Sequence, residues 1–161
     1  MTGFPLPIVD NGADDVPAVE APIVNDGFFP DVDPALFARE MRVREAVTPE
    51  RRRRALIDAI ITVGNQLAAW RDRQLLATSA TLADVPSPAV DGESRLVQLY
   101  HTAVFSEAKA KLVERYRDAD ITRAGKDQVE DLDPSIGELR RDSVYAVRDI
   151  LGVGRVAVEL I

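Results

Sequence analysis

The chain has 161 residues, 46% hydrophobic and 29% charged, which suits one globular domain with a sizeable core. Because it contains no cysteine, disulfide frameworks, thiolate metal sites and cysteine nucleophiles are excluded, and assembly in a reducing cytoplasm fits. The net charge of -7 argues against a general nucleic-acid binder, since duplex affinity comes mainly from basic residues that neutralise phosphates.

The start of the chain and its most apolar stretch both argue against membrane association. Pro5 and Pro7 interrupt the apolar helix that a secretory signal peptide would need. The most apolar stretch, residues 55–63, contains Asp58 and is far shorter than the roughly 20 residues of a membrane span. We therefore expect neither secretion nor contact with a membrane.

Residues 1–32 differ in composition from the rest of the chain. They hold five of the ten prolines and no Lys or Arg, and their acidic residues are Asp10, Asp14, Asp15, Glu20, Asp26 and Asp31. This pattern predicts an extended acidic arm, in which Phe28 and Phe29 would dock on a surface. The alternative, a terminus that makes no contacts, has about equal weight from composition alone.

Capping signals predict where the helices begin. A good N-cap residue precedes proline at Asp33-Pro34, Thr48-Pro49 and Asp133-Pro134. The first helix is expected over residues 34–47 and the second over residues 49–77. The second carries apolar residues at alternating steps of four and three, which places one face toward a core: Leu56, Ile60, Val63, Leu67 and Trp70.

Two more helices are expected after a proline-containing break. Asp91-Gly-Glu-Ser94 is expected to form the entry to the third helix, which would end near Asp118. The fourth would start around Pro134 or Ser135 and stop at Gly152, because glycine favours the left-handed conformation that ends a helix.

The segments on either side of the predicted fourth helix differ from the helices in composition. A predicted loop over residues 118–133 is long and acidic, with Asp118, Asp120, Asp127, Glu130 and Asp131. Residues 153–161 have the β-branched content and approximate alternation of a strand, but no other strong strand signal exists to pair with it. The predicted fold class is therefore all-α, with a four-helix bundle-like body over residues 33–152, an extended N-terminal arm and a C-terminal β-strand-like tail.

Patterns for catalysis and metal binding are weak. His101 is the only histidine, and we expect it to be a structural residue of the third helix. No nucleophile elbow, calcium loop or dinucleotide fingerprint occurs. We expect no enzymatic activity, no metal and no cofactor.

One strongly basic run lies in the first turn of the second predicted helix and consists of Arg51, Arg52, Arg53 and Arg54. Cations oppose the helix dipole at this position. Three interpretations stay open: a solvated face partly compensated by Glu50 and Asp58, an acidic protein partner, or DNA phosphate. On the last two, the chain would be a small helical DNA- or protein-binding regulator.

Four stretches, in order along the chain, carry a resemblance to a known family: Phe28-Phe-Pro-Asp-Val-Asp-Pro34, Asp91-Gly-Glu-Ser94, Leu112-Val-Glu-Arg-Tyr-Arg-Asp118, and Glu138-Leu-Arg-Arg-Asp142 through Val156-Ala-Val-Glu-Leu-Ile161. Together they make the chain resemble the head completion (L-type) proteins of tailed bacteriophages, which act as head-tail connector adaptors. The resemblance covers about residues 28–161. Val144-Tyr145 departs from the family pattern, which has a more basic, tryptophan-containing pair there.

The resemblance implies a structural virion protein, assembled in the host cytoplasm, that docks on the portal protein after DNA packaging. It implies a homo-oligomeric ring, a dodecamer, that helps to retain DNA and offers a platform to a neck or tail-terminator protein. Related adaptors insert their C-terminal segment into the portal, so the expected portal-binding residues are Arg155, Val156, Ala157, Val158, Glu159, Leu160 and Ile161. The acidic loop is expected to face packaged DNA in the channel without sequence-specific binding, because like charges repel.

Overall fold

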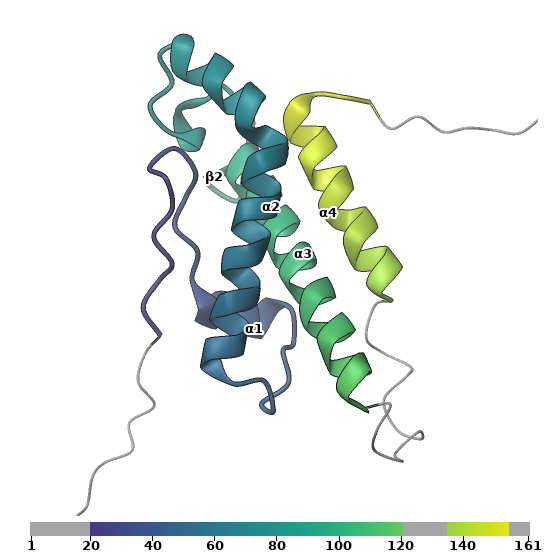
Figure 1. Cartoon of the computed structure of the whole chain (residues 1–161). Coiled ribbons are helices and arrows are strands. Elements are labelled where there is room, and N and C mark those ends of the chain that lie inside the picture. Colours follow the sequence, from purple (N-terminus) through teal and green to yellow (C-terminus); the bar gives the residue numbers. More distant parts are fainter. Residues whose placement is uncertain (1–19, 121–134, 155–161) are drawn as a thin grey trace, which may run out of the picture.

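Three long helices make up most of the body in the computed structural model of the chain (Figure 1). The structure describes residues 20–120 and 135–154, and for residues 116–120 it gives the helical backbone alone. Helices α2 (Pro49–Leu76), α3 (Arg95–Asp120) and α4 (Ile136–Leu151) alternate in direction, and the central helix α3 packs against both others. The short helix α1 (Pro34–Glu40) lies near the foot of α2.

The predicted capping residues explain where the helices begin. The side chains of Asp33 and Thr48 accept hydrogen bonds from backbone amides in the first turns of α1 and α2, as predicted. Helix α4 is instead capped by Ser135, two residues after the predicted cap Asp133, and the Ser135 side chain accepts a hydrogen bond from the Glu138 amide. At its other end, α4 stops at Gly152, which has φ of 70°. The predictions for α2 and α4 are confirmed to within one or two residues, because their signals are local.

The first helix is much shorter than the predicted range of residues 34–47. Helix α1 ends at Glu40, and Arg42 takes a left-handed conformation with φ of 47°. The turn that follows lets Val47 become buried, while Met41 and Val43 pack partly against the core. Tertiary burial of these residues therefore outweighs their helical propensity.

The segment before α3 is a hairpin, and α3 begins directly after it at Arg95, so the predicted entry to the third helix over residues 91–94 leads into the helix as a strand pair. Strands β1 (Ala89–Val90) and β2 (Glu93–Ser94) pair antiparallel, with Ala89 opposite Ser94. Asp91 and Gly92, at φ of 54° and 78°, form the turn between them, as an Asp-Gly pair favours. A short 3-10 helix, η1 (Leu82–Asp84), lies in the proline-containing break.

Residues 20–32, which we call the strap, lie along the body and contribute to its core. Ile23 and Val32 form a β-bridge, with a 2.7 Å hydrogen bond from the Ile23 amide to the Val32 carbonyl. Both are buried, as are Phe28 and Phe29. The body therefore includes a segment that the sequence analysis assigned to the arm.

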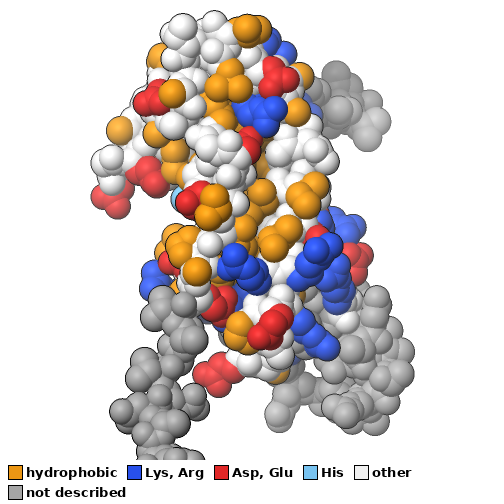
Figure 2. All heavy atoms as spheres, turned by 60° about the vertical axis from the view of Figure 1, so that its left-hand side comes forward, with side chains coloured by type: hydrophobic (Ala, Val, Ile, Leu, Met, Phe, Trp, Pro, Cys, Tyr) orange, Lys and Arg blue, Asp and Glu red, His pale blue; other side chains and the backbone are white. Residues whose placement is uncertain are grey.

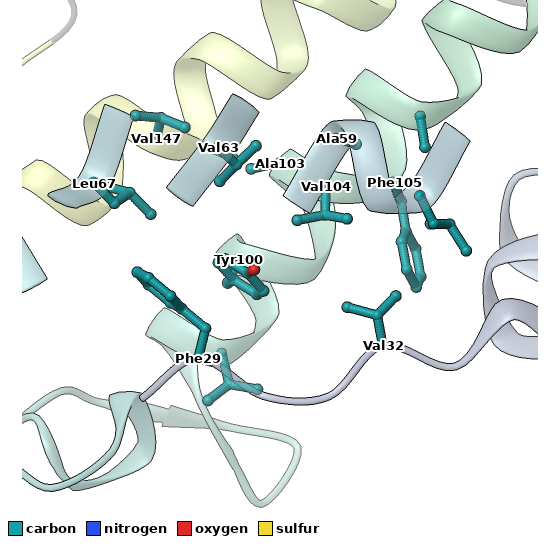
Figure 3. Close-up of a cluster of buried hydrophobic side chains, with 14 of the residues drawn as sticks. Phe29, Val32, Ala59, Val63, Leu67, Tyr100, Ala103, Val104, Phe105 and Val147 are labelled. Carbon is teal, nitrogen blue, oxygen red and sulfur yellow. The ribbon is translucent and has the colours of Figure 1, made fainter. Parts of the chain in front are cut away.

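The core lies where α2, α3 and the strap meet, and α4 closes it from the far side of α3 (Figures 1 and 3). Figure 3 shows Phe29 and Val32 of the strap facing the side chains of Tyr100, Val104 and Phe105 from α3. The described residues thus form a mostly helical fold with four α-helices and one short two-stranded sheet, which confirms the helical class in its coarser form.

Candidate interaction surfaces

The arginine run at the foot of α2 anchors the strap. Arg52 forms an ion pair with Glu20, and Nη1 of Arg53 donates to the Ala21 carbonyl at 2.7 Å. Arg54 pairs with Asp58 one turn later, at 3.2 Å, as the interpretation of a compensated face expected. The contact with residues 20–21 could not be predicted from the sequence, because no local pattern links residues more than 30 positions apart.

A second arginine holds the upper part of the strap. Arg71 lies 18 positions after Arg53, about five helical turns, so both project from the same side of α2. Its Nη1 bonds Asp26 at 2.8 Å. Burial raises the pKa of Asp26, but hydrogen bonds from the amides of Phe29 and Phe28 and from Arg71 outweigh this effect, so the pKa lies below its usual value. The strap is therefore fixed electrostatically at both ends of α2.

Aromatic side chains hold the strap between these two points. Phe29 stacks on Tyr100 of α3, with ring centroids 4.7 Å apart, and Phe28 meets Trp70 of α2 edge-on. Asn25 donates to the Tyr100 hydroxyl at 2.8 Å. Phe28 and Phe29, predicted to dock the arm on a surface, are therefore placed in the core of their own chain.

A polar cluster joins α2 to α3 beside the arginine run. The Asp58 carboxylate accepts from both Arg54 and Arg115, while Lys111 donates to the Asp58 carbonyl and to the Thr62 hydroxyl, each at 3.0 Å. Two guanidinium groups share one carboxylate, so the foot of α2 stays locally positive. In the view of Figure 2, most of the Lys and Arg side chains lie in the lower half of the molecule, with a few near its top.

Apolar residues, some exposed and some partly buried, form a row on the outward side of α2. At spacings that share one helix face lie Ile57, Ile61, Gly64, Ala68 and Leu75, which we call the α2 stripe. Ile61 is 55% exposed and Leu75 46% exposed, and on the neighbouring strap Val24 is 80% exposed. Figure 2 shows hydrophobic side chains along the middle of this face, above the basic region.

The residues predicted for the acidic loop and for portal binding lie either at the end of α3 or outside the described residues. Asp118 and Asp120, expected in the acidic loop, lie in the last turn of α3. The other three loop residues, Asp127, Glu130 and Asp131, lie outside the described residues, and so does the whole predicted portal-binding tail from Arg155 to Ile161.

His101 lies on α3 as expected, partly buried and stacked on Phe105 with ring centroids 5.6 Å apart. Within residues 20–115 and 135–154, no three acidic or histidine side chains gather as metal ligands would. None of the described helices combines the length and apolar character needed to cross a membrane.

Two phage proteins are similar to this chain along most of its length. The head completion/stabilization protein of Escherichia phage P2 is 38% identical over 146 residues, which cover 90% of this chain and 86% of that protein. The probable head completion/stabilization protein of Haemophilus phage HP1 (strain HP1c1) is 26% identical over 141 residues, or 86% of this chain and 91% of that protein. No solved structure matches the chain significantly.

The family comparison extends the resemblance seen in the sequence. The sequence model for phage head completion protein (GPL) matches residues 23–161, five residues more than the resemblance from Phe28 onward. It begins at Ile23, where the buried core of the described chain also begins. The chain belongs to the phage head completion protein (GPL) family.

Proposed function

We propose that this chain docks on the portal ring after DNA packaging, helps to retain the DNA and provides the platform on which the neck or tail assembles. Its family is one of structural head completion proteins, which makes the chain a virion component. The observation that carries the finer proposal is the extent of the family match, which runs through the C-terminal tail to Ile161. A segment with a strand pattern, in a sequence that has no other strong strand signal, suits addition to the edge of a portal sheet.

The tail is tested by removing it. Deleting residues 155–161 should leave the helical circular dichroism and thermal midpoint unchanged and abolish co-sedimentation with portal rings. Ala157→Pro, which removes one backbone donor from a strand, should weaken binding at full length, while Ala157→Ser should bind normally. Normal portal binding by the truncated chain would contradict the proposal.

Many weak tails acting together would make the docking long-lived. A single backbone hydrogen bond contributes only about 1 kcal/mol net, but copies arranged in a ring, a dodecamer by family resemblance, release only when many tails detach together. Such a ring of identical subunits needs two different faces on each chain, because its interfaces are head-to-tail. The mass of the assembly with and without portal, measured by analytical ultracentrifugation, tests this step.

We also propose that acidic residues after α3 face the channel and keep packaged DNA from sticking. Asp127, Glu130 and Asp131 give this segment a negative charge. The combined change Asp127→Asn, Glu130→Gln and Asp131→Asn should increase retention of duplex DNA by portal-bound chains at low salt. An unchanged retention would rule the channel orientation out.

The alternative function, a small helical regulator that uses Arg51 to Arg54, is disfavoured by the contacts within the chain. Arg52 and Arg53 hold residues 20–21, and Arg54 pairs with Asp58. A gel-shift titration of the isolated chain distinguishes the two functions, because a regulator would bind duplex with a steep salt dependence. We expect no such binding at physiological salt.

A further inference from the structure

We propose that residues 1–19 fold back on their own chain and cover the α2 stripe. The proposal concerns an interaction within one subunit, so it stands apart from portal docking. Three features support it: the exposed residues of the α2 stripe, the place where the strap begins, and the opposite charges of residues 1–19 and the foot of α2.

The α2 stripe is an apolar face on which Ile61 and Leu75 are exposed within the described residues. Ile61 has more than half of its surface exposed, one turn after the partly buried Ile57. At the centre of the stripe, a β-carbon added to Gly64 would meet nothing within 4 Å. Glycine weakens a helix interior, and here it leaves a shallow place where another backbone can approach α2.

The strap begins beside the lower end of this stripe. Arg53 bonds the Ala21 carbonyl, and Ile57 lies one turn further along α2, rotated by about 40° around the helix axis. Residues 1–19 therefore join the body next to the stripe. Extended, they reach up to about 60 Å, which exceeds the length of α2 at about 1.5 Å per residue.

The composition of residues 1–19 matches the stripe and its surroundings. This segment has apolar residues Phe4, Leu6, Ile8 and Val9, and its charged side chains are Asp10, Asp14 and Asp15, without any Lys or Arg. The foot of α2 carries the exposed Arg51, and Arg54 shares one carboxylate with Arg115. Apolar residues would cover the stripe while the aspartates lie near the arginines. The family match begins after this segment, at Ile23.

Because the chain has no cysteine, engineered cysteine pairs give a clean test. Leu6→Cys combined with Ile61→Cys should be joined by a short bis-maleimide at least about tenfold faster than Leu6→Cys combined with Val144→Cys. Val144 is a matched control, since it is 47% exposed but lies on α4, on the other side of the body from the strap (Figure 1). At low micromolar protein, the cross-linked product should have the mass of one chain.

Two further variants test whether the open space at Gly64 and the charges of Asp14 and Asp15 determine the cross-linking rate. Gly64→Leu fills the shallow place without a clash inside the body, so it should lower the Leu6–Ile61 cross-linking rate severalfold and leave the thermal midpoint no lower. Asp14→Lys with Asp15→Lys should lower the rate about threefold at low salt. Equal rates for the Ile61 and Val144 pairs, or a product with the mass of two chains, would overturn the proposal. Neither result would bear on portal docking, because no portal is present.

Discussion

Tyr100 links three parts of the molecule. It projects from α3, stacks on Phe29 and accepts a hydrogen bond from Asn25, so one fully buried side chain joins both halves of the strap to the helices. Burial raises the pKa of Tyr100 to about 12, although the hydrogen bond from Asn25 offsets part of this effect. The phenol therefore keeps its proton in the fold at pH values where an unfolded chain would lose it.

This shift predicts a loss of stability at alkaline pH. A tyrosine in the unfolded chain titrates near pH 10, so between about pH 10 and pH 12 the folded state holds a proton that the unfolded state releases. The free energy of unfolding should fall over this range, by up to about 3 kcal/mol. Tyr100→Phe should cost about 1 kcal/mol at pH 7, because Asn25 loses an acceptor, and it should flatten the alkaline slope. Urea unfolding at pH 8, 10 and 11 measures both effects; an equal slope in the variant would contradict the assignment.

Asp26 predicts the opposite pH dependence at the acid end. Its folded pKa is lowered, so its contribution is present above the unfolded value near 4 and is lost as pH falls through the folded pKa. Asp26→Asn keeps an oxygen for the two strap amides but loses the charge pair with Arg71, at a cost of about 1 kcal/mol at pH 7 for this partly exposed group. Asp26→Ala should cost about 2 kcal/mol, because it also removes the acceptor. At pH 2 to 3, the gap between the wild type and Asp26→Asn should close in urea titrations.

At the scale of elements, small side chains let α3 and α4 pack closely. Ser143 of α4 is buried, and its hydroxyl donates to the Ala103 carbonyl of α3 at 2.9 Å. The other small buried residues of these two helices include Ser106, Ala110 and Ala146. Short side chains at helical spacing allow the two helices to approach, so this interface depends on residue size more than on hydrophobicity.

Changes of size at Ser143 should therefore matter more than loss of its hydrogen bond. Ser143→Ala removes one buried bond and should cost about 1 kcal/mol. Ser143→Leu should cost about 3 kcal/mol, because the larger side chain pushes α4 away from α3. The neighbouring Val144→Leu, on an exposed position, should change the free energy of unfolding by less than about 0.5 kcal/mol. Equal effects of Ser143→Leu and Val144→Leu would mean that the interface is not close-packed.

At the scale of the whole molecule, the strap decides where the folding unit begins. Its buried side chains are Ile23, Phe28, Phe29 and Val32, and replacing a buried phenylalanine by alanine typically costs about 3 to 5 kcal/mol. The total free energy of unfolding of a domain of this size is about 5 to 15 kcal/mol. Removing the entire strap should therefore consume most or all of the stability of the body.

Two truncations test this boundary. Deleting residues 2–19 should lower the free energy of unfolding by less than about 1 kcal/mol, because every described contact of the strap remains. Deleting residues 2–32, the full length of the predicted arm, should abolish cooperative thermal unfolding or lower the midpoint by more than about 15 °C. Circular dichroism melts measure both, and similar melts for the two truncations would place the strap outside the folding unit.

The sequence by itself determined the three long helices and the family. Thr48, Ser135 and Gly152 act through backbone groups within four residues, so their signals are complete in a short window of sequence. The core-facing side of α2 could also be predicted from the sequence. Its residues Leu56, Val63, Leu67 and Trp70 are buried, and Ile60 is partly buried. The resemblance found in four short stretches also led to the family that the comparisons show.

Only the tertiary structure decided the role of residues 20–32 and of the arginine run. Glu20 meets Arg52 across 32 positions and Asn25 meets Tyr100 across 75, and no local pattern links residues so far apart. Proline content and acidity predicted an extended arm. They give no indication that Phe28 and Phe29 complete a core made by α2 and α3. Short-range signals decide which helices form. The burial of distant side chains against those helices decides which flanking residues join the body.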